Sequence, residues 1–139
     1  MTDSVYAGLD VSSEIRVIYE QQLGQTVLLW GKDSLDAFAV CHQGAGTEAG
    51  ANTCYIKFAA VRSGPNAESV FELLLRACEV HALQRGLQRM EAGVNAGRSE
   101  AYRTMLRFGY RADSYGIAMH RNDSPAYNRP GCYVVDDLR

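Results

Sequence analysis

The spacing of hydrophobic residues along the chain predicts three helices. Apolar side chains recur every three or four residues over residues 13–23, 66–84 and 99–108, which is the period of a helix with one buried face. The middle segment has the longest apolar stripe, and Gly86 follows it at a position where glycine commonly ends a helix. We therefore expect residues 66–84 to form the main helix of the core.

Short apolar runs between the helices predict strands. Residues 26–30 and 35–41 flank the turn sequence Gly31-Lys32-Asp33-Ser34, and together they predict a β-hairpin. Residues 44–52 are rich in glycine and alanine, so we expect them to form a loop between the hairpin and the next strand.

Residues 53–61 give the strongest strand prediction, because apolar side chains occupy both faces. Regular alternation would place Cys54, Ile56, Phe58 and Ala60 on one face, and Tyr55, Ala59 and Val61 with Lys57 on the other. A strand that is apolar on both faces is covered on both sides, so this segment is expected at the centre of a sheet.

Weaker patterns complete the chain. Residues 87–94 and 110–120 are expected to form strands, 122–131 a polar loop, and 133–136 a last short strand. No repeat or second core is visible, so residues 1–139 are expected to form one α/β (α+β) domain. The main helix connects two strands that should run parallel, within a mixed, mostly antiparallel sheet covered by helices on both faces.

Composition narrows the class of protein. Of 139 residues, 47% are hydrophobic, and no apolar run reaches the length of about 18 residues that spans a membrane. The net charge of -2 argues against a nucleic-acid partner. The first residues lack a secretion pattern, which predicts a cytoplasmic protein. The four cysteines form no C-x-x-C pair, so we expect reduced core cysteines and no metal site.

The connection between the central strand and the main helix is the candidate site. Residues 58–68 read Phe-Ala-Ala-Val-Arg-Ser-Gly-Pro-Asn-Ala-Glu. The first N–H groups of a helix lack intrahelical partners and lie at the positive end of its dipole, so they suit a phosphate group. Gly64 would let the backbone approach such a ligand, and Arg62 would add positive charge. The alternative is an ordinary turn, because Gly-Pro-Asn is also common turn chemistry.

Taken together, these segments resemble the GNAT superfamily of acyl-CoA-dependent N-acyltransferases. The pyrophosphate loop of that family reads Gln/Arg-x-x-Gly-x-Gly/Ala between a strand and a helix. The sequence Arg62-Ser63-Gly64-Pro65-Asn66-Ala67 matches its first and last positions, with Pro65 in place of the middle glycine. The later strand of the family and its helix ending in Gly-Phe correspond to residues 87–94, residues 101–108 and Gly109-Tyr110.

The resemblance implies a GNAT-like sheet whose central parallel strand pair splays apart. The cofactor would be acetyl-CoA or another CoA thioester, with its pantetheine arm in that opening. Backbone pairing with the arm is thereby assigned to Phe58, Ala60 and Val61. Binding of the pyrophosphate is assigned to Arg62, Ser63, Gly64, Asn66, Ala67 and Glu68. An amine of a small molecule or a protein would attack the thioester directly, aided by proximity and by a backbone donor for the developing oxyanion.

The family pattern also points to candidate catalytic residues. Many members place a tyrosine four residues before the closing glycine as the acid for the leaving thiolate, but that position is Met105 here, which cannot donate a proton. Tyr102 lies on nearly the same helical face and is the candidate acid, or else it packs in the core. Glu91 is a candidate base on the strand at residues 87–94, or a solvent-facing strand residue.

Two more residues are candidates for contacts with the cofactor. Asn95 either binds the cofactor arm or terminates the preceding strand. Arg98 either reaches a phosphate or is a solvated arginine at the start of a helix. Asp136 and Asp137, near the end of the chain, are expected to form a solvated acidic pair.

The front of the chain is shorter than the family pattern, since only about 24 residues precede the hairpin. We expect a shortened domain or the carboxyl-terminal half of a tandem protein, with an acceptor groove that is open or completed by a partner chain. Residues 133–136 are candidates to pair with the sheet edge of another subunit, which predicts a homodimer.

Two functional hypotheses follow. One is an N-acyltransferase that uses acetyl-CoA on an unidentified amine. The other is a catalytically inactive GNAT-like module that binds acyl-CoA or a protein partner, and Met105 and the shortened front favour it.

Overall fold

The computed structural model describes residues 1–5, 7–117 and 130–136. In chain order, the elements are α1 (Thr2–Val5), α2 (Ser12–Glu20), β1 (Gly24–Trp30), β2 (Leu35–Gly44), β3 (Gly50–Val61), α3 (Ala67–Gln84), β4 (Arg89–Ala92), α4 (Ser99–Arg107) and β5 (Val134–Asp136). The predicted hairpin, central strand and three helices are confirmed, with boundaries that differ by a few residues. The short helix α1 was not predicted.

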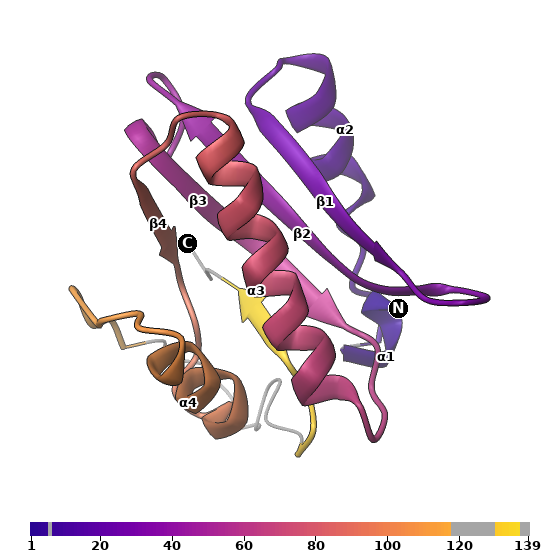
Figure 1. Cartoon of the computed structure of the whole chain (residues 1–139). Coiled ribbons are helices and arrows are strands. Elements are labelled where there is room, and N and C mark those ends of the chain that lie inside the picture. The colour runs from indigo at the N-terminus through magenta and orange to yellow at the C-terminus, as the bar shows by residue number, and fades with distance from the viewer. Residues whose placement is uncertain (6, 118–129, 137–139) are drawn as a thin grey trace.

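The strands form one five-stranded sheet in which β3 is central (Figure 1). β1 pairs with β2, and β2 with β3, in antiparallel fashion. The first part of β3 pairs in parallel with β4, from Thr53 beside Arg89 to Ile56 beside Ala92. The second part pairs in antiparallel fashion with β5, from Phe58 beside Asp136 to Ala60 beside Val134. Two different strands therefore share one edge of β3.

A β-bulge in β3 changes which side chains face which layer. Val40 of β2 pairs with Phe58 while the next residue, Cys41, pairs with Ile56, so Lys57 is the extra residue. Regular alternation was therefore the wrong expectation beyond Ile56. Cys54 and Ile56 share a face with Ala59 and Val61, whereas Phe58 and Ala60 pack on the opposite face.

Helices cover both faces of the sheet, as predicted. α3 and α4 pack on one face (Figure 1). There, Phe71, Leu74 and Leu75 of α3 belong to one core with the side chains of the sheet. α1 and α2 pack on the other face, where Val5 and Ile18 contact Phe38, Phe58 and Val134. Among the described residues, no helix is long and apolar enough to cross a membrane.

The segments after α3 differ most from expectation. β4 spans only Arg89–Ala92 rather than residues 87–94, and residues 110–117 form no strand. Residues 118–120 of that predicted strand, and most of the predicted loop at 122–131, lie outside the described residues. The last strand is confirmed as β5, and it pairs with β3 of its own chain. The closing glycine of α4 is also confirmed, since Gly109 has a φ of 91°.

Candidate functional site

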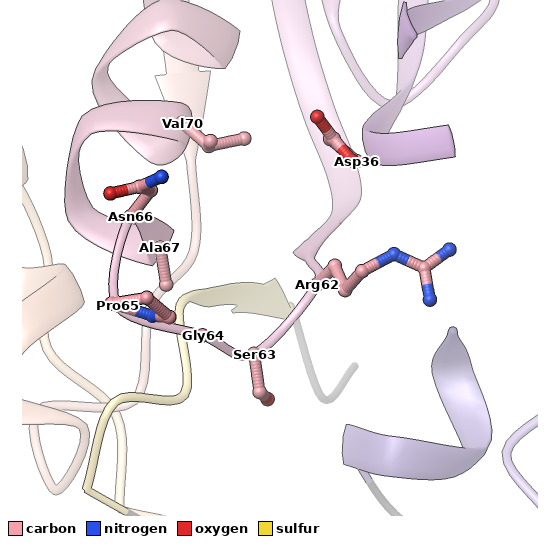
Figure 2. Close-up of a pocket in the computed structure, with 8 residues that line it drawn as sticks. All are labelled: Asp36, Arg62, Ser63, Gly64, Pro65, Asn66, Ala67 and Val70. Atoms are coloured by element: carbon pink, nitrogen blue, oxygen red, sulfur yellow. The ribbon is translucent and has the colours of Figure 1, made fainter. Parts of the chain in front are cut away.

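The loop between β3 and α3 borders an open pocket of about 190 Å³. The pocket is lined by Asp36 of β2, by loop residues Arg62, Ser63, Gly64, Pro65 and Asn66, and by Ala67 and Val70 of α3 (Figure 2). The Ala67 N–H donates to the Gly64 carbonyl at 3.1 Å, which closes the turn before the helix. The structure therefore brings the predicted loop residues together around one hollow.

The first turn of α3 presents its backbone to this pocket without a side-chain cap. Asn66 is the N-cap residue and makes no capping hydrogen bond through its side chain. The Ser69 hydroxyl donates backward to the Asn66 carbonyl at 2.9 Å, so it does not satisfy an N–H either. Amide donors and the positive end of the helix dipole are thus available to an anion. Ala67 is nearly fully buried and lines the pocket at the start of α3.

Arg62 does not point along the loop toward the helix. Its Nε and Nη2 atoms donate to the Leu35 carbonyl at 3.1 and 2.8 Å. Its guanidinium group lies on the side of the pocket away from Asn66 and Ala67 (Figure 2). The side chain is exposed, so a rotation about its flexible bonds would bring the charge toward the loop. As found, Arg62 ties the end of β3 to the start of β2.

A cation that the sequence did not single out lies beside the start of α3. Arg107, in the last turn of α4, forms ion pairs with Glu68 and with Glu72, the latter at 3.7 Å. Its Nη2 atom also donates to the Thr104 hydroxyl at 3.0 Å. Glu68 is therefore a partner of Arg107 rather than a free carboxylate at the helix start. No motif marks this pair, because it depends on how α4 packs against α3.

Tyr133 is a second residue that sequence reasoning missed. It packs against Phe71 of α3, with ring centroids 5.4 Å apart, and only 6% of it is exposed. Burial, together with the nearby carboxylates of Glu68 and Glu100, raises the pKa of Tyr133. Its phenol therefore stays protonated at neutral pH, beside the first turn of α3. Tyr133 follows α4 by many residues, so no local pattern connects it with the loop.

The backbone groups expected to pair with a pantetheine arm are already engaged. The Val61 N–H donates to the Tyr133 carbonyl at 3.2 Å, and the Arg62 N–H donates in the opposite direction to the Asp36 carbonyl at 2.7 Å. Backbone N–H and C=O groups point alternately to the two neighbouring strands. Those of Ala59 and Val61 point toward β5, and those of Phe58 and Ala60 point toward β2. The assignment of Phe58 and Ala60 to this edge is therefore corrected: the backbone groups of β3 at this edge are those of Ala59 and Val61.

Arg98 is neither solvated nor directed at the loop. Only 1% of it is exposed, and its Nη2 atom lies 3.5 Å from Oδ2 of Asp136, at the end of β5. Asp136 is likewise not the solvated acid that the sequence predicted. An arginine that is taken out of water needs such a partner, because an unpaired buried charge is strongly unfavourable. Arg98 is thus a structural residue that holds β5.

The remaining candidates lie apart and have local roles. The Asn95 side chain accepts a hydrogen bond from the Gly97 N–H at 2.8 Å, which closes a turn after β4 and fits the strand-terminating alternative. Glu91 forms an ion pair with Arg89 at 3.0 Å. Tyr102 is half-buried on α4, and the core on that helix is formed by Ala101, Thr104 and Met105 instead. Tyr102 and Glu91 belong to different elements, α4 and β4.

Cys41, Cys54, Cys78 and Cys132 are buried and form no disulfide among the described residues. A hydrogen bond to Cys41 and burial raise the pKa of Cys54, so this thiol is not a nucleophile at neutral pH. Within the described part of the chain, no cluster of three or more His, Cys, Asp or Glu residues could hold a metal ion.

Comparison with known proteins adds one likeness of fold. No protein-family model matches the chain, and no curated protein matches its sequence. The structure is similar to that of TTHA1254 from Thermus thermophilus, which was solved as a point mutant. The TM-score is 0.61 and the identity is 18%, with 88% of each chain covered. At this identity the likeness shows the fold alone.

Proposed function

We propose that the chain is an acyl-CoA-dependent N-acyltransferase that binds the pyrophosphate of its cofactor at the loop between β3 and α3. One observation carries the proposal: the pocket of about 190 Å³ lies against the uncapped first turn of α3. The same loop is the segment whose sequence resembles the GNAT pyrophosphate loop. Amide donors and a helix dipole at one hollow suit a diphosphate group better than an uncharged ligand.

Different groups of the protein would contribute to binding of the pyrophosphate. Amides of the first turn of α3 would hold the phosphate oxygens, and Arg62 would supply a mobile positive charge at the rim. Arg107 neutralises Glu68, which removes the carboxylate most opposed to an anion at this helix start. When bound, acyl-CoA would supply an activated acyl group for attack by an amine. The protein would contribute position and orientation to that reaction.

The charge of Arg62 tests the location of the site. Arg62→Glu should weaken the binding of CoA by about tenfold or more, because it replaces an attraction to phosphate with a repulsion. The affinity is measured by calorimetric titration, and circular dichroism checks that the variant folds. Arg16→Glu is the matched control, since Arg16 is an exposed arginine on α2. Equal affinity of wild type and Arg62→Glu would rule out this role for Arg62.

A second candidate function is binding of acyl-CoA without turnover. The position of Met105 favours it, because this side chain is 3% exposed and belongs to the core rather than to a catalytic cleft. The two functions are separated by mass-spectrometric detection of CoA released from acetyl-CoA in the presence of a panel of amines. Binding of CoA without amine-dependent release would support the second function.

Tyr102 is tested within the same assay. If its hydroxyl protonates the leaving thiolate, Tyr102→Phe should lower the maximal rate of CoA release by about a hundredfold. Tyr19→Phe, on the exposed face of α2, serves as the control. A Tyr102→Phe enzyme with the rate of the wild type would leave Tyr102 as a packing residue.

A further inference from the structure

β5 occupies the edge of β3 that adjoins the candidate site. Its residues Val134–Asp136 pair with Ala60, Ala59 and Phe58. The preceding residue, Tyr133, accepts a hydrogen bond from the Val61 N–H at 3.2 Å. The loop that borders the pocket begins at the very next residue, Arg62. β5 thus ends the sheet immediately beside the proposed pyrophosphate site.

The other side of β5 is held by the segment that follows β4. The Asp136 N–H donates to the Gly93 carbonyl at 3.2 Å, and the Asp136 carboxylate lies 3.5 Å from Arg98. β4 itself pairs with β3 only as far as Ala92. β5 therefore fills the opening that forms where β4 leaves the edge of β3.

A strand edge offers one row of N–H and C=O groups and accepts one extended partner at a time. At this edge of β3, the backbone N–H and C=O groups are those of Ala59 and Val61, and they point toward β5. The pantetheine arm of CoA is an extended chain that carries amide groups, so it would use the same row. Its path from a pyrophosphate at the loop leads directly onto this edge.

We propose that β5 and the arm of a CoA thioester compete for this edge of β3, so that β5 is a built-in inhibitor of cofactor binding. The inference rests on the proposed function, and it adds the regulation of that site. Only three residues of β5 pair with β3, so few backbone bonds are exchanged when the arm replaces it. The Asp136–Arg98 pair and the burial of Val134 and Val135 hold β5 in place without the cofactor.

A reversible disulfide between the two strands tests the competition. Ala60 and Val134 are directly paired, and both are fully buried. Ala60→Cys and Val134→Cys would join them, in a background carrying Cys132→Ser to prevent mispairing. Oxidised protein should bind CoA about tenfold or more weakly than the same protein after reduction. Each molecule is its own control, because only the cross-link differs.

Hydrogen exchange on the wild type gives an independent readout that needs no variant. Saturating CoA should accelerate exchange of the Val135 amide, because this N–H loses its partner on β3, while the amides of Ala59 and Val61 stay protected. Asp136→Asn should bind CoA about fivefold more tightly than wild type, since it weakens the hold on β5.

The outcomes separate this inference from the proposed function. Equal CoA affinity in the oxidised and reduced states, or a Val135 amide that stays protected at saturating CoA, would overturn the competition while leaving CoA binding intact. If wild type, the reduced double-cysteine protein and Asp136→Asn all fail to bind CoA while folded, the proposed function itself falls.

Discussion

Tyr110 shows how a single polar atom can act against the stability of this core. Its ring packs with the side chains between α3 and the sheet, and its hydroxyl is buried without a hydrogen-bond partner among the described residues. Burial, together with the nearby Cys78 and Glu79, raises the pKa of Tyr110. A neutral hydroxyl that has lost its water and gained no partner is a net cost to folding.

Removal of that hydroxyl should therefore stabilise the protein. We expect Tyr110→Phe to raise the free energy of unfolding by about 1 kcal/mol, because the desolvation cost disappears and the ring stays. Urea denaturation at neutral pH measures the change. Tyr102→Phe, at a half-buried tyrosine, should change it by less than about 0.5 kcal/mol. A destabilised Tyr110→Phe protein would show that the hydroxyl has a favourable partner.

The sequence did not predict the roles of residues whose partners are distant in the chain. The loop at Arg62 to Ala67 was predicted correctly as the connection that opens onto α3. The role of Arg98 was not, because its partner Asp136 belongs to a strand that only the folded sheet brings alongside. Asn95 could be judged locally, since its side chain bonds to a residue two positions away. Interactions between residues close in sequence can be predicted from the sequence, whereas ion pairs between distant elements depend on how those elements pack.

At the scale of elements, the bulge at Lys57 decides how β3 is built. Apolar periodicity predicted the strand and its central position, because both faces are hydrophobic with or without the bulge. The same property hid the bulge, since an extra residue in a strand that is apolar on both faces leaves no break in the pattern. The strand prediction failed more plainly at residues 110–117, which form no strand among the described residues.

The bulge makes a sharp prediction about deletion and substitution. Deleting Lys57 would place Phe58 directly after Ile56 in regular alternation, with Phe58 to Val61 on the faces that they occupy now. We therefore expect the deletion variant to keep a cooperative unfolding transition. Lys57→Ala keeps the backbone and removes only the side chain with its ion pair to Glu48. It should cost less than about 1 kcal/mol in the free energy of unfolding. A deletion variant that loses its cooperative transition would contradict the assignment of the bulge.

At the scale of the whole molecule, the free energy of unfolding should depend on pH through His81, which lies in the last turn of α3. Burial and the nearby Arg85 lower the pKa of His81 from 6.5, and its Nε2 atom lies 3.1 Å from Oε1 of Gln43. The unfolded chain therefore takes up a proton at a higher pH than the folded chain does. The contribution of His81 to the free energy of unfolding is therefore fully present above pH 6.5, and it is lost as the pH falls below that value.

Chemical denaturation of wild type and His81→Gln between about pH 5 and 8 isolates this contribution. The decline in the free energy of unfolding below pH 6.5 should be shallower for His81→Gln, because that variant has no imidazole to protonate. Parallel profiles for the two proteins would assign the decline to other groups.

The pairing of β5 with β3 also determines the order in which this molecule can be completed. The hairpin, β3 and α3 arise from residues 24–84, whereas β5 comes about 50 residues later, at Val134–Asp136. During synthesis on the ribosome, the edge of β3 at Ala59 and Val61 stays without β5 until Val134–Asp136 have emerged. For that interval an apolar strand edge lies open to other nascent chains, so this edge is where a chaperone would be most needed.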